Sequence, residues 1–207
     1  MTADPSTDQP AAPPVRLLTV CTGNVCRSPY AAALLANGLA WARPGAFEVT
    51  SAGTHALVGR PIEKGSRVLL EDKGVPVPAT PARMVTPALL ADQALVLVMS
   101  PRHREAVLEE APAVVRRTVG IVDLVAALRE VGEQYSWPDL LADVGAKEVR
   151  ARWRALPEVL AAVRAMPERV TVVEDPYQRG SRSFGRMAAQ LDSAVRALVR
   201  WEVQFPR

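Results

Sequence analysis

Cys21 and Cys26, the two cysteines of the chain, lie close together near its start. Arg27 follows Cys21 at the sixth position, and Ser28 comes next. A thiolate is a strong nucleophile, and a helix N-terminus or a nearby cation favours the ionised sulfur. A planar guanidinium can hold two phosphoryl oxygens at once. This order of residues favours attack on phosphorus by Cys21, with Arg27 as the phosphate clamp and Ser28 as a hydroxyl donor to the sulfur.

The residues after Cys21 are of types that form an anion-binding loop. Gly23 and Asn24 are residue types that tolerate positive φ at little cost, so the loop can coil and point successive backbone N–H groups inward. Such a concave array, next to a helix N-terminus, attracts a dianion such as phosphate. The predicted phosphate-binding residues are Thr22, Gly23, Asn24, Val25, Cys26, Arg27 and Ser28.

Asp175 is the candidate general acid, because a phosphate ester needs a proton on its leaving oxygen. Pro176 follows it and biases Asp175 toward an extended conformation, which would hold the carboxyl group on a rigid loop. The alternatives are a plain Asp-Pro turn and, for Cys21, a small buried apolar residue. Cys26 is either such a buried residue or a partner that captures oxidised Cys21 as a reversible disulfide.

The elements around these residues alternate between strand and helix. Val15–Val20 is short, apolar and rich in branched residues, which predicts a buried strand ending at Cys21. Tyr30–Ala42 predicts a helix, with Ser28 as N-cap and Pro29 at the first position. Further strands are predicted at Phe47–Ser51, Ala94–Met99 and Thr118–Leu124, and helices at Pro61–Gly74, Pro101–Glu110 and Phe184–Val203. We expect one α/β domain with a parallel sheet and helices on both faces.

The domain is expected to span residues 15–207, behind a disordered, proline-rich tail of residues 1–14. A helical insertion is predicted at about residues 125–168, broken by Pro138 and Pro157 and packed as an extra layer on the sheet. No function is assigned to it.

Composition excludes several classes of protein. The formal net charge is +3, from 25 basic and 22 acidic residues, without a separate basic stripe, so nucleic-acid binding is not expected. The first fourteen residues lack the pattern of a signal peptide, and no run of 18 apolar residues predicts a membrane span. Two cysteines are too few for a secreted disulfide framework, so a reducing, cytoplasmic location is expected. The Arg- and Ala-rich, Lys-poor composition indicates a GC-rich bacterial source.

Three stretches resemble the low-molecular-weight protein tyrosine phosphatase family. Cys21–Pro29 resembles the signature loop of the family, and Asp175–Tyr177 resembles its acid loop. Val49–Thr54 resembles its second strand and the Ser-Ala-Gly-Thr turn that follows. The resemblance implies a four-stranded parallel, flavodoxin-like sheet, no metal and no cofactor. It implies Cys21 as nucleophile through a cysteinyl-phosphate, Arg27 as clamp, and Asp175 as acid and then base. Asn24 would hold the loop, supported by Ser51. The implied substrate is a phosphotyrosine protein or a small phosphate ester.

The sequence departs from the family next to the second turn, where His55–Val58 lacks the aromatic residue that often stacks on the substrate ring. Tyr177 is expected to form one wall of the pocket, and Gln178 stands where a second Tyr often lies. Two other functions stay open. One is an arsenate reductase that uses an external small thiol, and the other is a non-catalytic regulator that binds a phosphorylated ligand.

Overall fold

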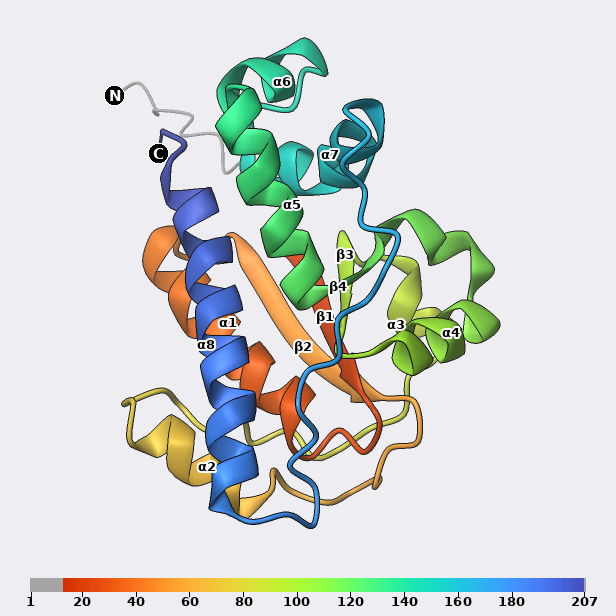
Figure 1. Cartoon of the computed structure of the whole chain (residues 1–207), viewed down its shortest axis with the longest axis vertical. Helices are drawn as coiled ribbons and strands as arrows, with labels where there is room; N and C mark the ends of the chain where they lie inside the picture. Colours follow the sequence, from red (N-terminus) through yellow and green to blue (C-terminus); the bar gives the residue numbers. More distant parts are fainter. Residues whose placement is uncertain (1–12, 207) are drawn as a thin grey trace, which may run out of the picture.

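The computed structural model describes residues 13–206 and places four parallel strands in one sheet, in the order β2-β1-β3-β4 (Figure 1). The strands are β1 (Val15–Cys21), β2 (Phe47–Gly53), β3 (Leu95–Val98) and β4 (Thr118–Gly120). β1 pairs with β2 on one side and β3 on the other, so the strand that ends at Cys21 is central. The predicted tail, residues 1–14, lies outside the described residues except for Pro13 and Pro14.

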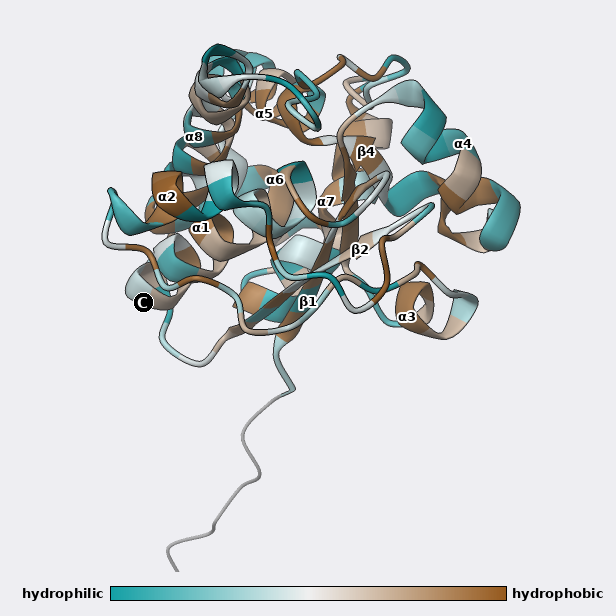
Figure 2. Cartoon of the chain, turned by 90° about the horizontal axis from the view of Figure 1, so that it is seen from below, coloured by the Kyte–Doolittle hydropathy of each residue, from teal (hydrophilic) through white to brown (hydrophobic). Residues whose placement is uncertain are grey.

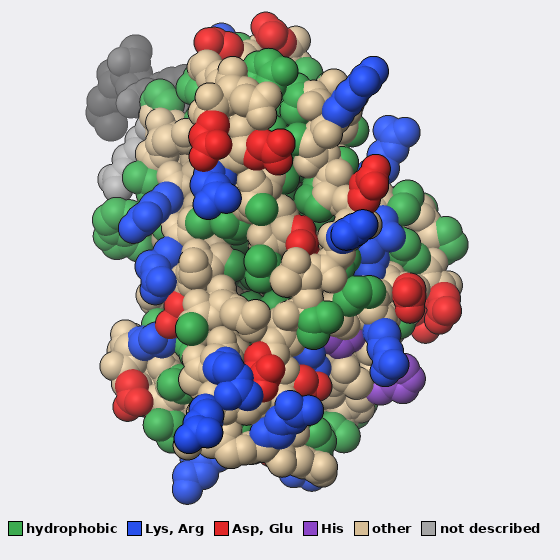
Figure 3. Space-filling view, viewed as in Figure 1, with side chains coloured by type: hydrophobic (Ala, Val, Ile, Leu, Met, Phe, Trp, Pro, Cys, Tyr) green, Lys and Arg blue, Asp and Glu red, His purple; other side chains and the backbone are tan. Residues whose placement is uncertain are grey.

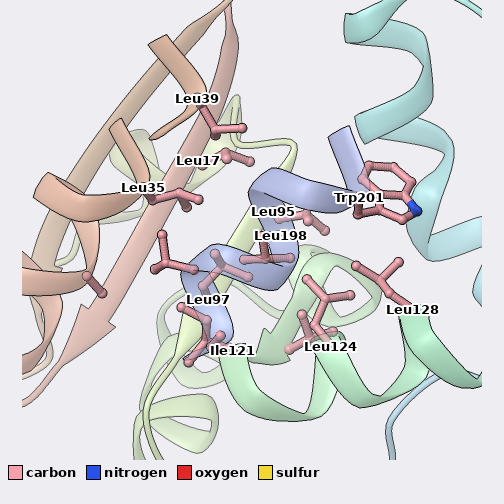
Figure 4. Packing of buried hydrophobic residues seen from close by; sticks show 14 of the residues in the cluster. Leu17, Leu35, Leu39, Leu95, Leu97, Ile121, Leu124, Leu128, Leu198 and Trp201 are labelled. Carbon is pink, nitrogen blue, oxygen red and sulfur yellow. The ribbon is translucent and has the colours of Figure 1, made fainter. Parts of the chain in front are cut away.

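Both faces of the sheet are buried, because its central strands consist of nearly continuous apolar residues that must be covered on either side. Side chains alternate between the faces along a strand, so Leu17 joins the larger apolar cluster and Leu18 the smaller one. The larger cluster contains residues of α1 (Arg27–Ala42), α5 (Ile121–Gln134), α7 (Val149–Ala162) and α8 (Ser181–Val203) (Figure 4). The smaller one lies under α3 (Pro87–Ala91), α4 (Pro101–Glu110) and the 3₁₀ turn η1 (Pro112–Arg117). Figure 2 shows the apolar strands enclosed by these more polar helices. The predicted fold class is confirmed.

The predicted helical insertion contains most of α5, all of α6 (Trp137–Asp143), and α7. α6 and α7 lie beside the N-terminal end of the sheet, and α7 contacts β1 (Figure 1). The prediction that Pro157 breaks this region is wrong, because Pro157 lies inside α7. Its neighbours Trp153, Leu156 and Leu160 are buried, and their packing offsets the cost of an interior proline.

A buried charged group joins this region to the last helix. Glu202 of α8 is fully buried and accepts hydrogen bonds from Arg43 Nε at 2.7 Å, Arg152 Nη2 at 2.7 Å and Trp153 Nε1 at 2.8 Å. Trp153 also packs edge-to-face on Trp201, with ring centroids 5.3 Å apart. A buried charge is tolerated only when it is paired and hydrogen-bonded, so Glu202 holds the ends of α1, α7 and α8 together.

Predicted boundaries move at several elements, among them α1, α2 (Lys64–Glu71) and β4. α1 begins at Arg27 and not after Ser28, because the Ser28 side chain is hydrogen-bonded to Asn24 and lies against Cys21 instead of capping a helix. α2 is shorter than predicted, although Gly74 adopts the left-handed φ of 65° that ends such segments. β4 stops at Gly120, and α5 begins at the next residue. None of the described helices is both long enough and apolar enough to cross a bilayer.

Candidate active site

Cys21 is the last residue of the central strand, and the loop that follows it returns directly into α1. This is the crevice at the carboxyl ends of parallel strands where ligands bind in open α/β sheets. Cys21 Sγ lies 3.0 Å from Ser28 Oγ. Asn24 Nδ2 donates to the same Ser28 oxygen at 3.0 Å, so the single Ser28 proton is left for Cys21 Sγ or for Ala52 O at 3.3 Å. An ionised Cys21 sulfur would accept that hydrogen bond in preference to Ala52 O, because a hydrogen bond to a charged acceptor is stronger than one to a neutral acceptor.

The loop turns its carbonyl groups outward. Thr22 O, Gly23 O and Val25 O accept hydrogen bonds from the backbone N–H groups of His55, Leu57 and Glu63, at 3.0, 3.0 and 2.7 Å. The backbone N–H groups from Thr22 to Ser28 donate to no other described residue. They surround the N-terminus of α1, whose N-cap residue Cys26 makes no side-chain capping bond. This arrangement is an anion site of the predicted kind.

Asn24 braces this loop. It adopts φ 55°, its Nδ2 donates to Ser51 Oγ at 2.9 Å, and its Oδ1 accepts from the backbone N of Arg83 at 2.9 Å. Ser51 therefore lies where the resemblance implied. Of the two residues expected to tolerate positive φ, Asn24 adopts it and Gly23 does not. A Cβ at Gly23 would meet its nearest neighbour, Val25, at an ordinary 3.5 Å.

Asp175 reaches the same place from the far end of the chain. Its Oδ2 accepts from Arg27 Nη2 at 2.7 Å, although the two residues are 148 positions apart. The Arg27 side chain is only 6% exposed and the Asp175 side chain is 44% exposed, so the acid faces the opening and the clamp lies inside. Arg27 Nε is buried without a partner among the described residues, so it still has a donor to offer. The structure thus brings Cys21, Arg27 and Asp175 together.

These residues line a small pocket of about 150 Å³. Its walls are Thr22, Gly23, Val25, Cys26, His55, Leu57 and Tyr177, around Cys21, Arg27 and Asp175. Tyr177 contributes the one aromatic ring besides the His55 imidazole among the lining residues. A larger cavity of about 690 Å³ lies near α6 and the end of α8, but no cysteine, serine, threonine or histidine lines it. Chemistry, not volume, distinguishes the smaller pocket.

The two cysteines differ in environment. Both are free and buried. Burial, followed by the negative charges of Cys21 and Glu63, raises the pKa of the Cys26 thiol to about 12. Cys26 is therefore a neutral thiol at pH 7 and is not a competing nucleophile.

Comparison with known proteins identifies the family. A family model described as low molecular weight phosphotyrosine protein phosphatase matches residues 16–135. The chain belongs to this family. It is 35% identical over 114 residues to a protein-arginine-phosphatase of Geobacillus stearothermophilus, a match that covers 55% of the chain and 73% of the relative. It is also 35% identical over 103 residues to the low molecular weight protein-tyrosine-phosphatase Etp of Escherichia coli K12, covering 50% of the chain and 66% of the relative.

A solved structure extends the likeness of fold over most of the chain. Vibrio vulnificus Wzb in complex with benzylphosphonate superposes with a TM-score of 0.61 at 22% identity, covering 90% of the chain and 97% of that protein. The predicted family, enzyme class and cysteine-dependent phosphatase activity are confirmed, and the comparisons do not favour the arsenate reductase.

Two residues that support the loop of this phosphatase were missed from the sequence. His103 is buried, and its Nε2 lies 2.9 Å from Thr22 Oγ1. Burial, with a smaller contribution from Arg27, lowers the pKa of His103 to about 4, so the ring is neutral at pH 7. His103 follows the end of β3, and its position after a central strand could have revealed it. Arg83 braces Asn24 through its backbone N–H, which no side-chain pattern could reveal.

Proposed function

We propose that the chain hydrolyses phosphate monoesters on proteins, with Cys21 as nucleophile, Arg27 as phosphate clamp and Asp175 as acid and base. One observation carries these roles: sulfur, guanidinium, carboxyl group and a row of unbonded backbone N–H groups meet in one pocket of about 150 Å³. Phosphoryl transfer needs positioning and charge stabilisation more than any other help from a protein, and this arrangement supplies both.

The substrate phosphate competes with Asp175 for Arg27. In the structure Arg27 Nη2 donates to Asp175 Oδ2, and both residues line the pocket that holds Cys21. When phosphate oxygens take over the guanidinium, the Asp175 carboxyl group lies beside a dianion, where the protonated form is favoured because like charges repel. Binding thus places a proton next to the leaving oxygen.

In the first step the Cys21 thiolate forms a bond to phosphorus while the bond from phosphorus to the ester oxygen breaks. The Asp175 proton goes to that oxygen, which leaves as a neutral alcohol or phenol. In the second step Asp175, now a carboxylate, takes a proton from water as the water oxygen attacks phosphorus. The sulfur–phosphorus bond breaks, the thiolate is restored, and the Ser28 hydroxyl at 3.0 Å stabilises it.

Phosphotyrosine is the first candidate substrate, because the pocket is small and Tyr177 offers a ring beside the phosphate site. Phosphoarginine on a protein is the second candidate. Its phosphorus is bonded to nitrogen and not to an ester oxygen, so with this substrate Asp175 would give its proton to the leaving guanidine nitrogen. The Geobacillus relative, of which the match covers 73%, is named a protein-arginine-phosphatase. Besides Tyr177 and the His55 imidazole, no aromatic side chain on which phosphotyrosine could stack is among the lining residues. We place the enzyme in the bacterial cytoplasm, where both free thiols would stay reduced.

The test combines a chemical trap with a leaving-group series. Cys21→Ser should retain the fold and abolish turnover of para-nitrophenyl phosphate, and rapid quenching of the wild-type enzyme should yield phosphate bound to Cys21. Asp175→Ala should slow the hydrolysis of poor leaving groups about 100-fold or more, and that of good ones less. Equal slowing across the series would contradict the acid role.

The substrates are then ranked by measuring kcat/KM for peptides that carry phosphotyrosine, phosphoserine or phosphoarginine. Thiol-dependent reduction of arsenate, measured in parallel, should be absent. A non-catalytic regulator would bind these peptides without releasing phosphate.

A further inference from the structure

A second cavity opens directly beside the active-site pocket. Its volume is about 410 Å³, and it shares two lining residues, Val25 and Leu57, with the pocket that holds Cys21. The two spaces are therefore neighbours across a single wall. We call the second one the basic groove, because Arg60, Lys64 and Arg67 line it.

The groove is fixed relative to the nucleophile by backbone hydrogen bonds. Glu63 N donates to Val25 O at 2.7 Å, and Leu57 N donates to Gly23 O at 3.0 Å. Arg60 N in turn donates to Leu57 O at 2.9 Å. Two of these three bonds end on carbonyl groups of the phosphate-binding loop itself. A ligand group in the groove would therefore lie at a set distance and direction from Cys21.

The charge of the groove is positive. Three cations line it against one carboxylate, Glu63. Glu63 Oε2 already accepts from the backbone N of Lys64 at 3.0 Å, as the N-cap of α2. No carboxylate among the described residues lies within 4.0 Å of the Arg60 or Lys64 side chain. Arg67 has only a long, exposed contact to Glu71 at 3.8 Å. Figure 3 shows the wider setting, with Lys and Arg side chains gathered over α2 and the start of α8.

We propose that the basic groove binds an acidic side chain that flanks the phosphorylated residue of a protein substrate. The inference rests on the proposed function and adds to it the class of substrate: phosphoproteins with Asp or Glu close to the phosphorylated position. Charge complementarity and the shared wall support it, since the groove lies next to the pocket in which the phosphate would bind. The apolar part of the lining, from Val25 and Leu57, would contact the methylene groups of Glu.

The expected effect is moderate, because the cations are exposed. An exposed ion pair changes an equilibrium or rate by about 1.5- to 5-fold. Two such contacts from one side chain should thus raise kcat/KM by about 2- to 25-fold over a neutral flank. Salt should reduce the advantage, because exposed charges are screened over about 10 Å at 0.1 M ionic strength.

The experiment uses three phosphotyrosine peptides that differ only in having Glu, Gln or Lys at the positions next to the phosphotyrosine. The full chain should rank them Glu above Gln above Lys in kcat/KM, and 0.5 M salt should compress the ranking. In Arg60→Glu/Lys64→Glu the order should reverse. Each value is divided by the same variant's kcat/KM for para-nitrophenyl phosphate, which has no flanking residue.

Arg129→Glu is the matched control, because Arg129 lies on α5 with its side chain 78% exposed and away from both cavities. The kcat/KM values of this variant for the three peptides should follow the same order as those of the wild type. Equal rates for the three peptides, or a reversal caused by Arg129→Glu as well, would overturn the groove proposal. If the wild-type chain did not hydrolyse para-nitrophenyl phosphate at all, the proposed function would be overturned instead, so the two failures are distinguishable.

Discussion

Gly53 tests whether the position of the phosphate-binding loop controls catalysis. It is the last residue of β2 and pairs in register with Cys21. A Cβ added to Gly53 would overlap the carbonyl oxygen of Thr22 and would lie 3.0 Å from both the backbone N and the Cβ of Asn24. Two of these three neighbours are backbone atoms of the loop and cannot rotate away. Gly53→Ala should therefore displace the loop and not merely a side chain.

The size of the effect follows from that overlap. Relieving it to an ordinary contact requires a shift of about 1 Å, and a misplacement of that size costs about 100-fold in rate. The extra methyl group should also destabilise the fold by about 1–3 kcal/mol, as other overpacked sites do. We expect kcat/KM for para-nitrophenyl phosphate to fall about 100-fold and inhibition by inorganic phosphate to weaken, while the protein stays folded.

The assay compares Gly53→Ala with Gly185→Ala. A Cβ at Gly185, inside α8, meets nothing within 4 Å. That control should keep wild-type kinetics and gain about 1 kcal/mol in urea unfolding, because Ala is a better helix former than Gly. If folded Gly53→Ala kept its kcat/KM within threefold of the wild type, the argument that loop position limits catalysis would be refuted.

Three other predictions concern buried groups. Glu202→Gln leaves two buried arginines without their carboxylate and should cost about 3–5 kcal/mol in urea unfolding. His103 has a pKa of about 4 in the folded protein against 6.5 as its ordinary value, so the unfolded state binds more protons between those values. Stability should fall by up to about 3 kcal/mol as the pH drops from 6.5 to 4, and His103→Gln should remove that slope. Peroxide inactivation should be reversible by reductant in the wild type and irreversible in Cys26→Ala, since Cys26 would capture the oxidised Cys21 sulfur and release water.

Each of these predictions has a result that contradicts it. Glu133→Gln, at an exposed pair 3.9 Å long, should change stability by less than about 0.5 kcal/mol, and an equally small change in Glu202→Gln would show that the buried group is not structural. If the stability of His103→Gln fell with pH as steeply as that of the wild type, a group other than His103 would be responsible for the pH dependence. Equal recovery of wild type and Cys26→Ala after peroxide would exclude a protective disulfide.

The chemistry of the phosphate-binding loop could be predicted from the sequence because the loop is local. Cys21 ends β1, Arg27 and Ser28 begin α1, and the short loop between the strand and the helix leaves few arrangements for their side chains. The alternation of strands and helices likewise predicted the parallel sheet, since its faces need covering by helices. Some errors were at boundaries, as with Ser28, whose hydroxyl faces the sulfur and does not cap α1, and one was Pro157, which lies inside α7.

Contacts between distant segments were decided only by the tertiary structure. Asp175 meets Arg27 because its segment is held against the sheet, where Val173 N donates to Met99 O at 2.9 Å, and no local pattern records that bond. Arg83 braces Asn24 through its backbone N–H, a group that every residue type except proline possesses. The basic groove likewise depends on Glu63 N meeting Val25 O. Local residue types determined which reaction this protein can perform, whereas the acid, the brace and the groove required long-range packing, because backbone hydrogen bonds carry no residue-specific signal.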